Sequence, residues 1–122
     1  MVQNIERRKF IRKRVRMACA FSMSSGMMFY GNTVDVSLQG VCMESPSFSS
    51  GSGGPLNPGD SGLLTLRFRI GDKEENMKVR CQVMHVAANG VGLSIRYADL
   101  SKKDQDNLGK IIASGKANIE ED

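Results

Sequence analysis

Two short groups of polar residues carry the chemistry that this sequence suggests. The first has the pattern RRxxxR (Arg7, Arg8, Arg12), and the second has the pattern DxSxxG (Asp35, Ser37, Gly40). Guanidinium groups bind anions, and their planar fork of donors matches phosphate oxygens. A carboxylate and a hydroxyl two residues apart offer hydrogen-bond acceptors for a ligand. Each pattern is weak alone, but together they indicate that this chain binds a ligand.

The basic charge of the chain is confined to its N-terminal segment. Residues 1–16 hold seven Lys/Arg against Glu6, a balance of +6, whereas the other 106 residues hold ten against twelve, a balance of −2. A local field of this kind attracts phosphate, nucleic acid or a membrane surface. A solvated basic tail without a partner is the alternative.

Length and composition indicate one soluble domain. The chain has 122 residues, of which 40% are hydrophobic and 25% charged. Charges occupy the N-terminus, and no apolar run approaches the roughly 20 residues that cross a bilayer, so we expect a cytoplasmic protein without membrane insertion. The three cysteines, Cys19, Cys42 and Cys81, are widely spaced, which favours buried thiols over a disulfide or a metal site. We therefore expect no metal.

The elements that must position the two motifs are predominantly strands. Apolar residues alternate with polar ones in six segments, which lie at about 15–23, 27–36, 40–44, 64–70, 77–84 and 91–97. A stretch rich in Ser, Gly and Pro at 45–61 predicts a long loop, and Asn89-Gly90 predicts a tight turn. Six short strands without crossover helices predict a mainly β fold, a six-stranded antiparallel β-barrel.

One helix is expected after the strands. Ser101 is a candidate N-cap with Asp104 three residues later, and the helix should end before Gly115. We expect it to pack across an open end of the barrel. The predicted organisation is a flexible basic arm at 1–14, a barrel with its helix at 15–113, and an acidic tail at 114–122.

The DxSxxG group falls where the second strand ends. Asp35 and Ser37 are two residues apart, so both side chains would emerge on one face of an extended strand. Gly40 should have a backbone role, either a positive φ at the turn or close approach of a ligand. A simple turn between strands, stabilised by the Asp and Ser side chains, is the alternative for these three residues.

The sequence resembles a known family. The segments ERRKFIR at 6–12, DVSLQG at 35–40 and GVGLSIRY at 90–97 are similar to those of the PilZ domain, the bacterial receptor module for cyclic di-GMP. The resemblance extends over residues 5–113. It implies a small β-barrel whose N-terminal arginine segment folds over cyclic di-GMP held against the barrel surface.

The resemblance also implies roles for individual residues. Arg8 and Arg12 would contact phosphate and the O6/N7 edge of guanine, and Asp35 would accept from the guanine amino edge with Ser37 beside it. In that family, an arginine at the position of Arg7 accompanies the binding of an intercalated pair of ligand molecules. His85 and Arg80 are candidates for lining the ligand, although a solvated strand position explains either one as well.

A non-catalytic receptor is the function that these features predict. No nucleophile with a paired base, no Gly-rich phosphate loop and no carboxylate pair indicates an enzyme. The arm would order when cyclic di-GMP binds and would signal to an unidentified partner protein, in a process such as motility or exopolysaccharide synthesis. A nucleic-acid-binding barrel and a ligand-independent protein adaptor are the alternatives.

Overall fold

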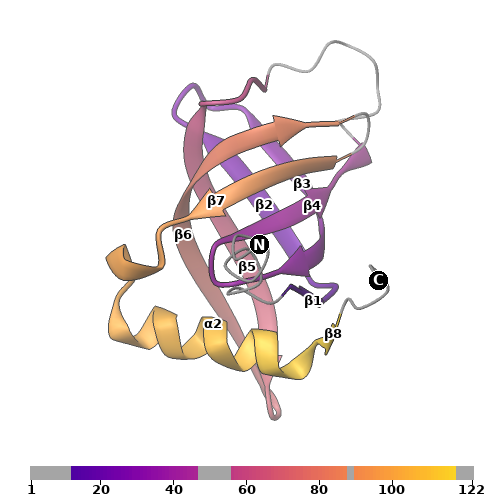
Figure 1. The fold of residues 1–122 in the computed structure, drawn as a ribbon, viewed down its shortest axis with the longest axis vertical. Helices are drawn as coiled ribbons and strands as arrows, with labels where there is room; N and C mark the ends of the chain where they lie inside the picture. The colour runs from indigo at the N-terminus through magenta and orange to yellow at the C-terminus, as the bar shows by residue number, and fades with distance from the viewer. Residues whose placement is uncertain (1–11, 47–55, 88–89, 118–122) are drawn as a thin grey trace, which may run out of the picture.

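The six strands close into an antiparallel barrel, as the sequence predicts. The computed structural model describes residues 12–46, 56–87 and 90–117. The barrel strands are β2 (Ala18–Met23), β3 (Met28–Val36), β4 (Gly40–Glu44), β5 (Ser61–Ile70), β6 (Lys73–Val86) and β7 (Gly90–Ile95). They are ordered β2-β5-β6-β7-β4-β3, and pairing of β2 with β3 closes the barrel (Figure 1).

The core is formed by the residues that alternate inward. Phe21, Leu64 and Leu66 are fully buried, and their neighbours in sequence are more exposed. This period of two is the pattern of a strand with one buried face, and it accounts for the mainly β fold. The outer face of the barrel carries polar residues together with some exposed apolar side chains, such as Tyr30 and Met84.

Two strands of two residues each extend the sheet beyond β3. These are β1 (Lys13–Arg14), which pairs with β3, and β8 (Lys116–Ala117), which pairs with β1. The alternation predicts a strand from residue 15, but β2 begins at Ala18. Met17 continues the β2–β3 register, through its N–H to Thr33 Oγ1 at 3.0 Å and its carbonyl to the Thr33 N–H at 2.9 Å, but the pairing with β5 ends at Cys19.

The predicted helix is present as α2 (Lys102–Ser114). The Ser101 hydroxyl accepts from the Asp104 N–H at 3.1 Å, as expected of an N-cap. Leu108 and Ile111 are buried in the barrel core, so α2 covers the end of the barrel at the foot of Figure 1. A short 3-10 turn, η2 (Tyr97–Asp99), joins β7 to α2.

The long Ser/Gly/Pro-rich loop lies partly outside the described residues, as does Asn89. Its described end is attached to the barrel, because the Gly59 N–H donates to the Val83 carbonyl and the Val83 N–H to the Asp60 carbonyl, both at 2.7 Å. Across the ranges that the structure describes, no helix has the length and apolarity needed to span a membrane.

Candidate functional site

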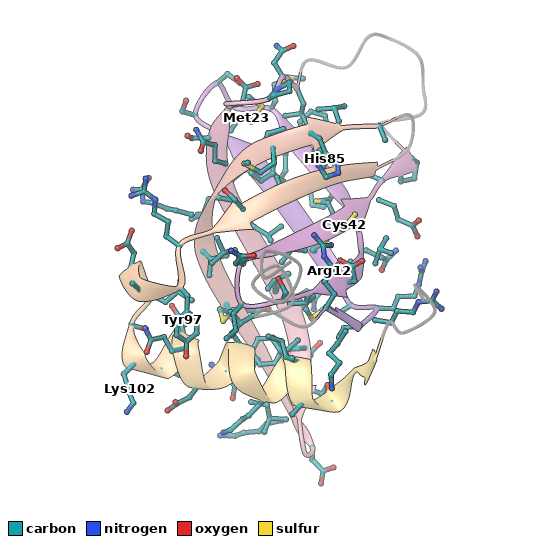
Figure 2. The ribbon with its side chains drawn as sticks, in the orientation of Figure 1. Arg12, Met23, Cys42, His85, Tyr97 and Lys102 are labelled. Atoms are coloured by element: carbon teal, nitrogen blue, oxygen red, sulfur yellow. The ribbon has the colours of Figure 1, made fainter. Side chains whose placement is uncertain are left out.

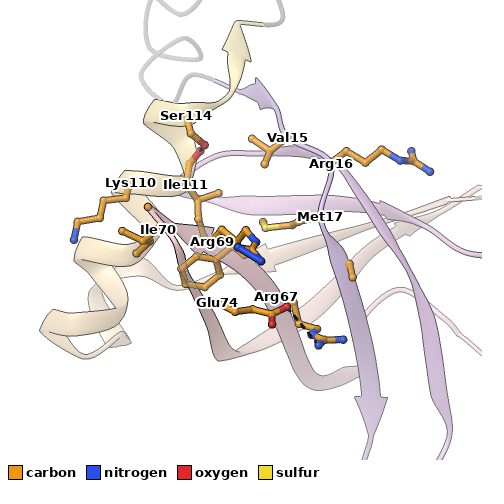
Figure 3. A pocket seen from close by; sticks show the side chains of 13 residues that line it. Val15, Arg16, Met17, Arg67, Arg69, Ile70, Glu74, Lys110, Ile111 and Ser114 are labelled. Atoms are coloured by element: carbon orange, nitrogen blue, oxygen red, sulfur yellow. Dashed lines mark hydrogen bonds and ion pairs between the residues drawn. The ribbon is translucent and has the colours of Figure 1, made fainter.

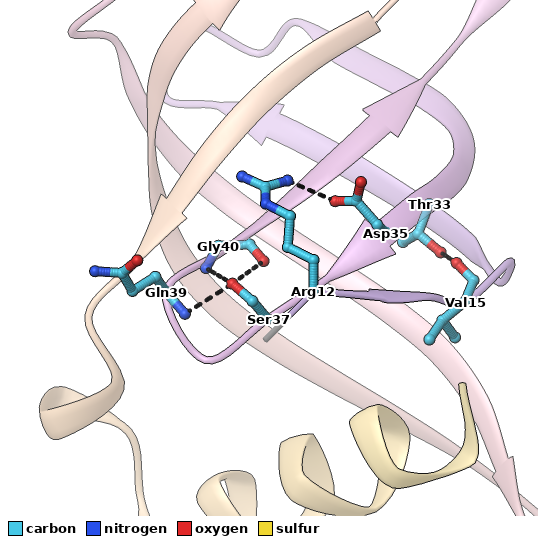
Figure 4. A network of polar contacts seen from close by, with 7 residues as sticks. All are labelled: Arg12, Val15, Thr33, Asp35, Ser37, Gln39 and Gly40. Atoms are coloured by element: carbon cyan, nitrogen blue, oxygen red, sulfur yellow. Dashed lines mark hydrogen bonds and ion pairs between the residues drawn. The ribbon is translucent and has the colours of Figure 1, made fainter. Parts of the chain in front are cut away.

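An ion pair joins the two motifs. Arg12 Nη1 lies 2.7 Å from Asp35 Oδ1, although 23 positions separate the two residues in the sequence (Figure 4). The Asp35 side chain is 12% exposed and that of Arg12 is 55% exposed, so the guanidinium lies over the carboxylate. Pairing of Arg14 with Asp35 in the β1–β3 ladder brings the end of the arginine motif to this point. Arg7 and Arg8 lie outside the described residues.

A bulge on β3 precedes the acidic residue. Thr33 pairs with Met43 and Asp35 with Cys42, so Val34 is an extra residue on β3. A bulge re-aims the side chains that follow it. Asp35 consequently lies opposite Cys42, whose side chain belongs to the outer face of β4. This irregularity is what brings the carboxylate to the barrel surface beside Arg12.

Ser37 forms the turn between β3 and β4. Its hydroxyl accepts from the N–H groups of Gln39 at 3.1 Å and Gly40 at 3.2 Å, and its own N–H donates to the Gly40 carbonyl at 2.9 Å (Figure 4). Because β3 ends at Val36, the extended-strand argument that put Asp35 and Ser37 on one face does not apply to Ser37. In this structure the Ser37 hydroxyl holds the turn.

Gly40 allows two strands to approach closely. It is not among the described glycines with positive φ, which are Gly26, Gly59 and Gly71. A Cβ on Gly40 would lie 2.3 Å from the Leu93 carbonyl oxygen on β7. Its backbone role in this structure is therefore close packing of β4 on β7, and the expected positive φ is not observed.

The ion pair borders a groove on the side of the barrel, which we call the side groove. It has a volume of about 430 Å³ and is lined by Arg12, Ser37, Cys42, His85, Gly92 and Arg96, among others. The strand registers place Asp35, Cys42, Gly92 and His85 in one row across β3, β4, β7 and β6. Figure 2 shows Arg12, Cys42 and His85 over this part of the barrel.

His85 reaches this groove because of a second bulge. Val83 pairs with Leu93 and His85 with Gly92, so Met84 is an extra residue on β6. Without the bulge, the alternation that buries Val83 would turn the imidazole inward. Instead it is exposed and covers Gly92, where an added Cβ would lie 2.3 Å from His85 Cε1. A floor of two small residues, Cys42 and the Gly92 that the imidazole covers, thus lies in the row from Asp35 to His85.

The thiol in the floor is influenced by both members of the ion pair. Partial burial raises the pKa of Cys42, the Asp35 carboxylate raises it further, and the Arg12 guanidinium lowers it. The other two cysteines are in the core, where burial raises the pKa of Cys19 and of Cys81 to about 12. All three described cysteines are free thiols; Cys19 and Cys81 are buried, as the sequence predicts, whereas Cys42 is only partly buried.

The other candidate from the sequence, Arg80, lies in a separate hollow. This hollow has a volume of about 500 Å³ and contains Lys78 and Arg80, and it shares Ser94 and Arg96 with the side groove. Arg96 was not predicted from the sequence. The alternation along β7 could have indicated it, because Arg96 lies two positions after Ser94 and so falls on the same outward face. Cys42 and Gly92 could not be found that way, since their positions depend on strand pairing.

Comparison with known proteins identifies the family. The sequence profile described as the PilZ domain matches residues 6–114. The chain belongs to the PilZ domain family. No curated protein matches it. Among the described residues, no three His, Cys, Asp or Glu side chains are grouped so that they could hold a metal ion.

Solved structures of PilZ domains share the barrel. The PilZ domain of YcgR from Escherichia coli, solved with c-di-GMP, has a TM-score of 0.68 at 15% identity, over 88% of this chain and 90% of that one. The PilZ domain of CeSA from a cellulose-synthesizing bacterium has a TM-score of 0.58 at 10% identity, over 84% of this chain and 94% of that one.

A longer protein also contains this fold. The inhibitor of motility MotI/DgrA from Bacillus subtilis has a TM-score of 0.69 at 12% identity over 87% of this chain. Only 49% of MotI/DgrA is covered, so our chain spans about half the length of that protein. At these identities the likeness establishes the fold.

Proposed function

We propose that this PilZ domain is a non-catalytic receptor that binds cyclic di-GMP in the side groove. The observation that carries the proposal is the Arg12–Asp35 ion pair, which joins the arginine motif to the DxSxxG motif at the border of that groove. The YcgR domain with the same fold was solved with c-di-GMP, which supports the choice of ligand. The rest of the proposal follows from the chemistry of the groove.

Arg12 and Asp35 offer complementary groups to a guanine nucleotide. A guanidinium has five N–H donors, and the hydrogen bond to Asp35 uses one nitrogen, Nη1. The remaining donors suit phosphate oxygens or the O6/N7 edge of guanine. The second carboxylate oxygen of Asp35 suits the N–H groups on the amino edge. The ion pair would thus hold both partners in place for the ligand.

The floor of the groove suits a planar base. Cys42 and Gly92 are small, and three steps between neighbouring strands separate Asp35 from His85, roughly 14 Å at about 4.8 Å per step. A purine laid over this floor could meet the imidazole by stacking. The groove volume of about 430 Å³ lies within the ordinary range for small-molecule sites.

The N-terminal arm would complete the site. Arg8 would add a second phosphate or guanine contact, and Arg7 would offset the four negative charges of two intercalated ligand molecules. Binding would then order the arm over the groove and present a changed surface to a partner protein, in a cytoplasmic signalling process such as motility or exopolysaccharide regulation.

Calorimetric titration with cyclic di-GMP tests the site. The wild-type chain should bind two ligand molecules, and Arg12→Ala and Asp35→Ala should each weaken binding strongly, whereas Lys103→Ala on α2 should not. Arg7→Ala should reduce the stoichiometry to one. A wild-type stoichiometry of one that Arg7→Ala leaves unchanged would contradict the two-molecule site.

Two further ligands separate this proposal from its alternatives. GTP and a short single-stranded oligonucleotide should bind far more weakly than cyclic di-GMP at low and high salt. Tighter, steeply salt-dependent oligonucleotide binding that is lost in Arg12→Ala but kept in Asp35→Ala would indicate a general phosphate surface. If no nucleotide bound, the ligand-independent protein adaptor would be the remaining alternative.

Hydrogen exchange tests the proposed ordering of the arm. The amides of residues 5–16 should exchange more slowly at saturating cyclic di-GMP, because ligand contacts would hold the arm on the barrel. Unchanged exchange in this segment, with ligand binding verified in the same sample, would rule out the ordering mechanism while leaving the receptor function intact.

A further inference from the structure

A second groove lies at the end of the barrel beside α2, and we call it the end groove. It has a volume of about 670 Å³ and lies between residues 15–18, the end of β5 with Gly71 (residues 67–71), and the C-terminal half of α2 (Figure 3). Its apolar walls include Met17, Phe68 and Ile111, all of which are largely buried. The described motif residues Arg12, Asp35, Ser37 and Gly40 do not line it.

The end groove exposes one edge of a strand. β5 pairs with β6 along its whole length, from Ser61 to Ile70, but its pairing with β2 ends at Leu66. Before Cys19 the chain keeps the β2–β3 register, in which Met17 bonds to Thr33, but it no longer pairs with β5. Among the described residues, no strand therefore pairs with residues 67–70 on the β2 side. Such an edge is a template for an added strand.

The border of the end groove is strongly basic. Arg16, Arg67, Arg69 and Lys110 line it with Glu74, four cations against one carboxylate, a formal balance of +3. Arg16 pairs with Glu44 at 2.9 Å and Arg67 with Glu74 at 3.5 Å. Arg69 and Lys110 have no ion pair with any other described residue. In Figure 3, Met17, Arg69 and Ile111 lie between Arg16 and Lys110.

An unpaired strand edge, an apolar wall and unpaired cations together define what the end groove would recognise. We propose that it binds an extended acidic segment of a partner protein, added as a strand to residues 67–70 of β5. Backbone groups of the segment would pair with the β5 edge. Alternate side chains would meet Met17 and Phe68, and carboxylates would meet Arg69 and Lys110.

The acidic tail of the chain itself is a poorer occupant. Ala117 pairs with Lys13 and Lys116 with Arg14, so β8 runs away from Val15 and from the end groove as the chain proceeds. A separate acidic segment therefore fits the charge and the strand edge better than the tail.

Fluorescence anisotropy tests the end groove directly. The probe is a labelled eight-residue peptide in which acidic residues alternate with valine, titrated with the full chain in the absence and presence of cyclic di-GMP. We expect Arg69→Glu and Lys110→Glu each to weaken binding by about tenfold or more, because each replaces an attraction with a repulsion. Lys102→Glu, at the far end of α2, is the matched control and should bind normally.

Two modified probes separate strand addition from simple charge attraction. The same peptide with N-methyl groups on alternate amides keeps its charges but loses the backbone N–H donors along one of its edges. It should therefore bind at least about tenfold more weakly than the unmodified peptide. A peptide with lysine in place of the acidic residues should not bind. Equal binding of the N-methylated and unmodified peptides would overturn the proposal.

Three other results would also overturn it. These are unchanged peptide affinity in Arg69→Glu and Lys110→Glu, tighter binding of an oligonucleotide than of the peptide, and peptide binding seen only after removal of residues 118–122. The last result would make the tail the occupant of the groove. Because none of these readouts requires cyclic di-GMP, failure here is distinguishable from failure of the proposed receptor function.

Discussion

The side groove and the end groove are both basic, yet their surroundings differ. In the side groove Arg12 is paired with Asp35 and Arg96 with Asp99, and the floor consists of small residues between a carboxylate and an imidazole. In the end groove Arg69 and Lys110 have no ion pair to another described residue, the wall is apolar, and β5 has an unpaired edge. Positive charge alone therefore does not identify what either groove binds.

The difference lies in the hydrogen-bonding groups beside the cations. A carboxylate next to a guanidinium suits a ligand with both acceptors and donors, as a guanine nucleotide has. An unpaired strand edge suits a ligand with a backbone of its own. We therefore expect the side groove to select a compact nucleotide and the end groove to select an extended peptide.

One segment links the two grooves. Residues 13–17 connect Arg12 in the side groove to Met17 in the end groove, and Thr33 holds this segment on β3 through contacts with Val15 and Met17 (Figure 4). A ligand that moves Arg12 would act on the same segment. Measurements on single variants distinguish grooves that act separately from grooves that act through this connection.

The largest expected effect is that of Arg12→Ala on cyclic di-GMP. Loss of a charged donor should weaken binding by about 100-fold, in line with the roughly 1.5–3 kcal/mol of a charge-assisted hydrogen bond. The acidic peptide should bind this variant normally, because Arg12 does not line the end groove. Calorimetry for the nucleotide and anisotropy for the peptide measure the two effects, and an equal loss of both would remove the distinction between the grooves.

Two glycine substitutions should separate stability from binding. Gly40→Ala places a Cβ against the rigid Leu93 carbonyl and should lower the free energy of unfolding by about 1–3 kcal/mol. Gly92→Ala meets only the movable His85 ring, so it should cost less stability but should weaken cyclic di-GMP binding. Thermal melts and titrations give both quantities. Equal destabilisation by the two substitutions would contradict these glycine roles.

Thr33→Val tests the connection between the grooves. The substitution keeps the shape but leaves the Met17 N–H without its side-chain acceptor, which should cost about 1–2 kcal/mol. Because residues 13–17 would be held less firmly, we expect cyclic di-GMP and the acidic peptide both to bind a few-fold more weakly. Thr65→Val, at a strand position on β5, is the control. Loss of affinity for only one ligand would show that the grooves do not share this support.

The smallest effect is expected in thiol reactivity. Thiol reagents attack the thiolate, and burial raises the pKa of Cys19 and Cys81 to about 12, so both should stay protonated and unreactive at pH 8. Cys42 should react first, at a rate that rises with pH because its pKa is also raised.

Protection of Cys42 distinguishes the two ligands. Cyclic di-GMP should slow its modification several-fold by covering the floor of the side groove, and the acidic peptide should not. Mass spectrometry of the modified chain locates the label. Protection by the peptide but not by cyclic di-GMP would reverse the assignment of the two grooves.

Much of the fold could be predicted from the sequence because the inward residues repeat with a period of two. Leu64, Leu66 and Phe68 on β5 are an example, and the Ser101 cap of α2 followed from its residue type and spacing. The alternation of burial continues through Val15 and Met17, but the pairing with β5 ends at Cys19, which the period alone does not indicate. It also cannot indicate β1 and β8, which are too short to show a period.

The side groove was only partly predictable. The resemblance of the motifs indicated Arg12 and Asp35 as partners in one site, but the contact between them depends on the bulge at Val34. The bulge at Met84, which turns His85 outward, breaks the very period used for prediction. Likewise, the role of Gly40 depends on the close approach of β7, which the sequence around Gly40 does not indicate.

Amide chemical shifts of the isotopically labelled chain test the two-groove account most directly. Titration with cyclic di-GMP should shift the amides of Gly40, Gly92 and Ser94, and titration with the acidic peptide should shift those of residues 67–70. Both ligands together should shift both groups. If cyclic di-GMP shifted residues 67–70 and left Gly40 and Gly92 unchanged, the assignment of the nucleotide to the side groove would be contradicted.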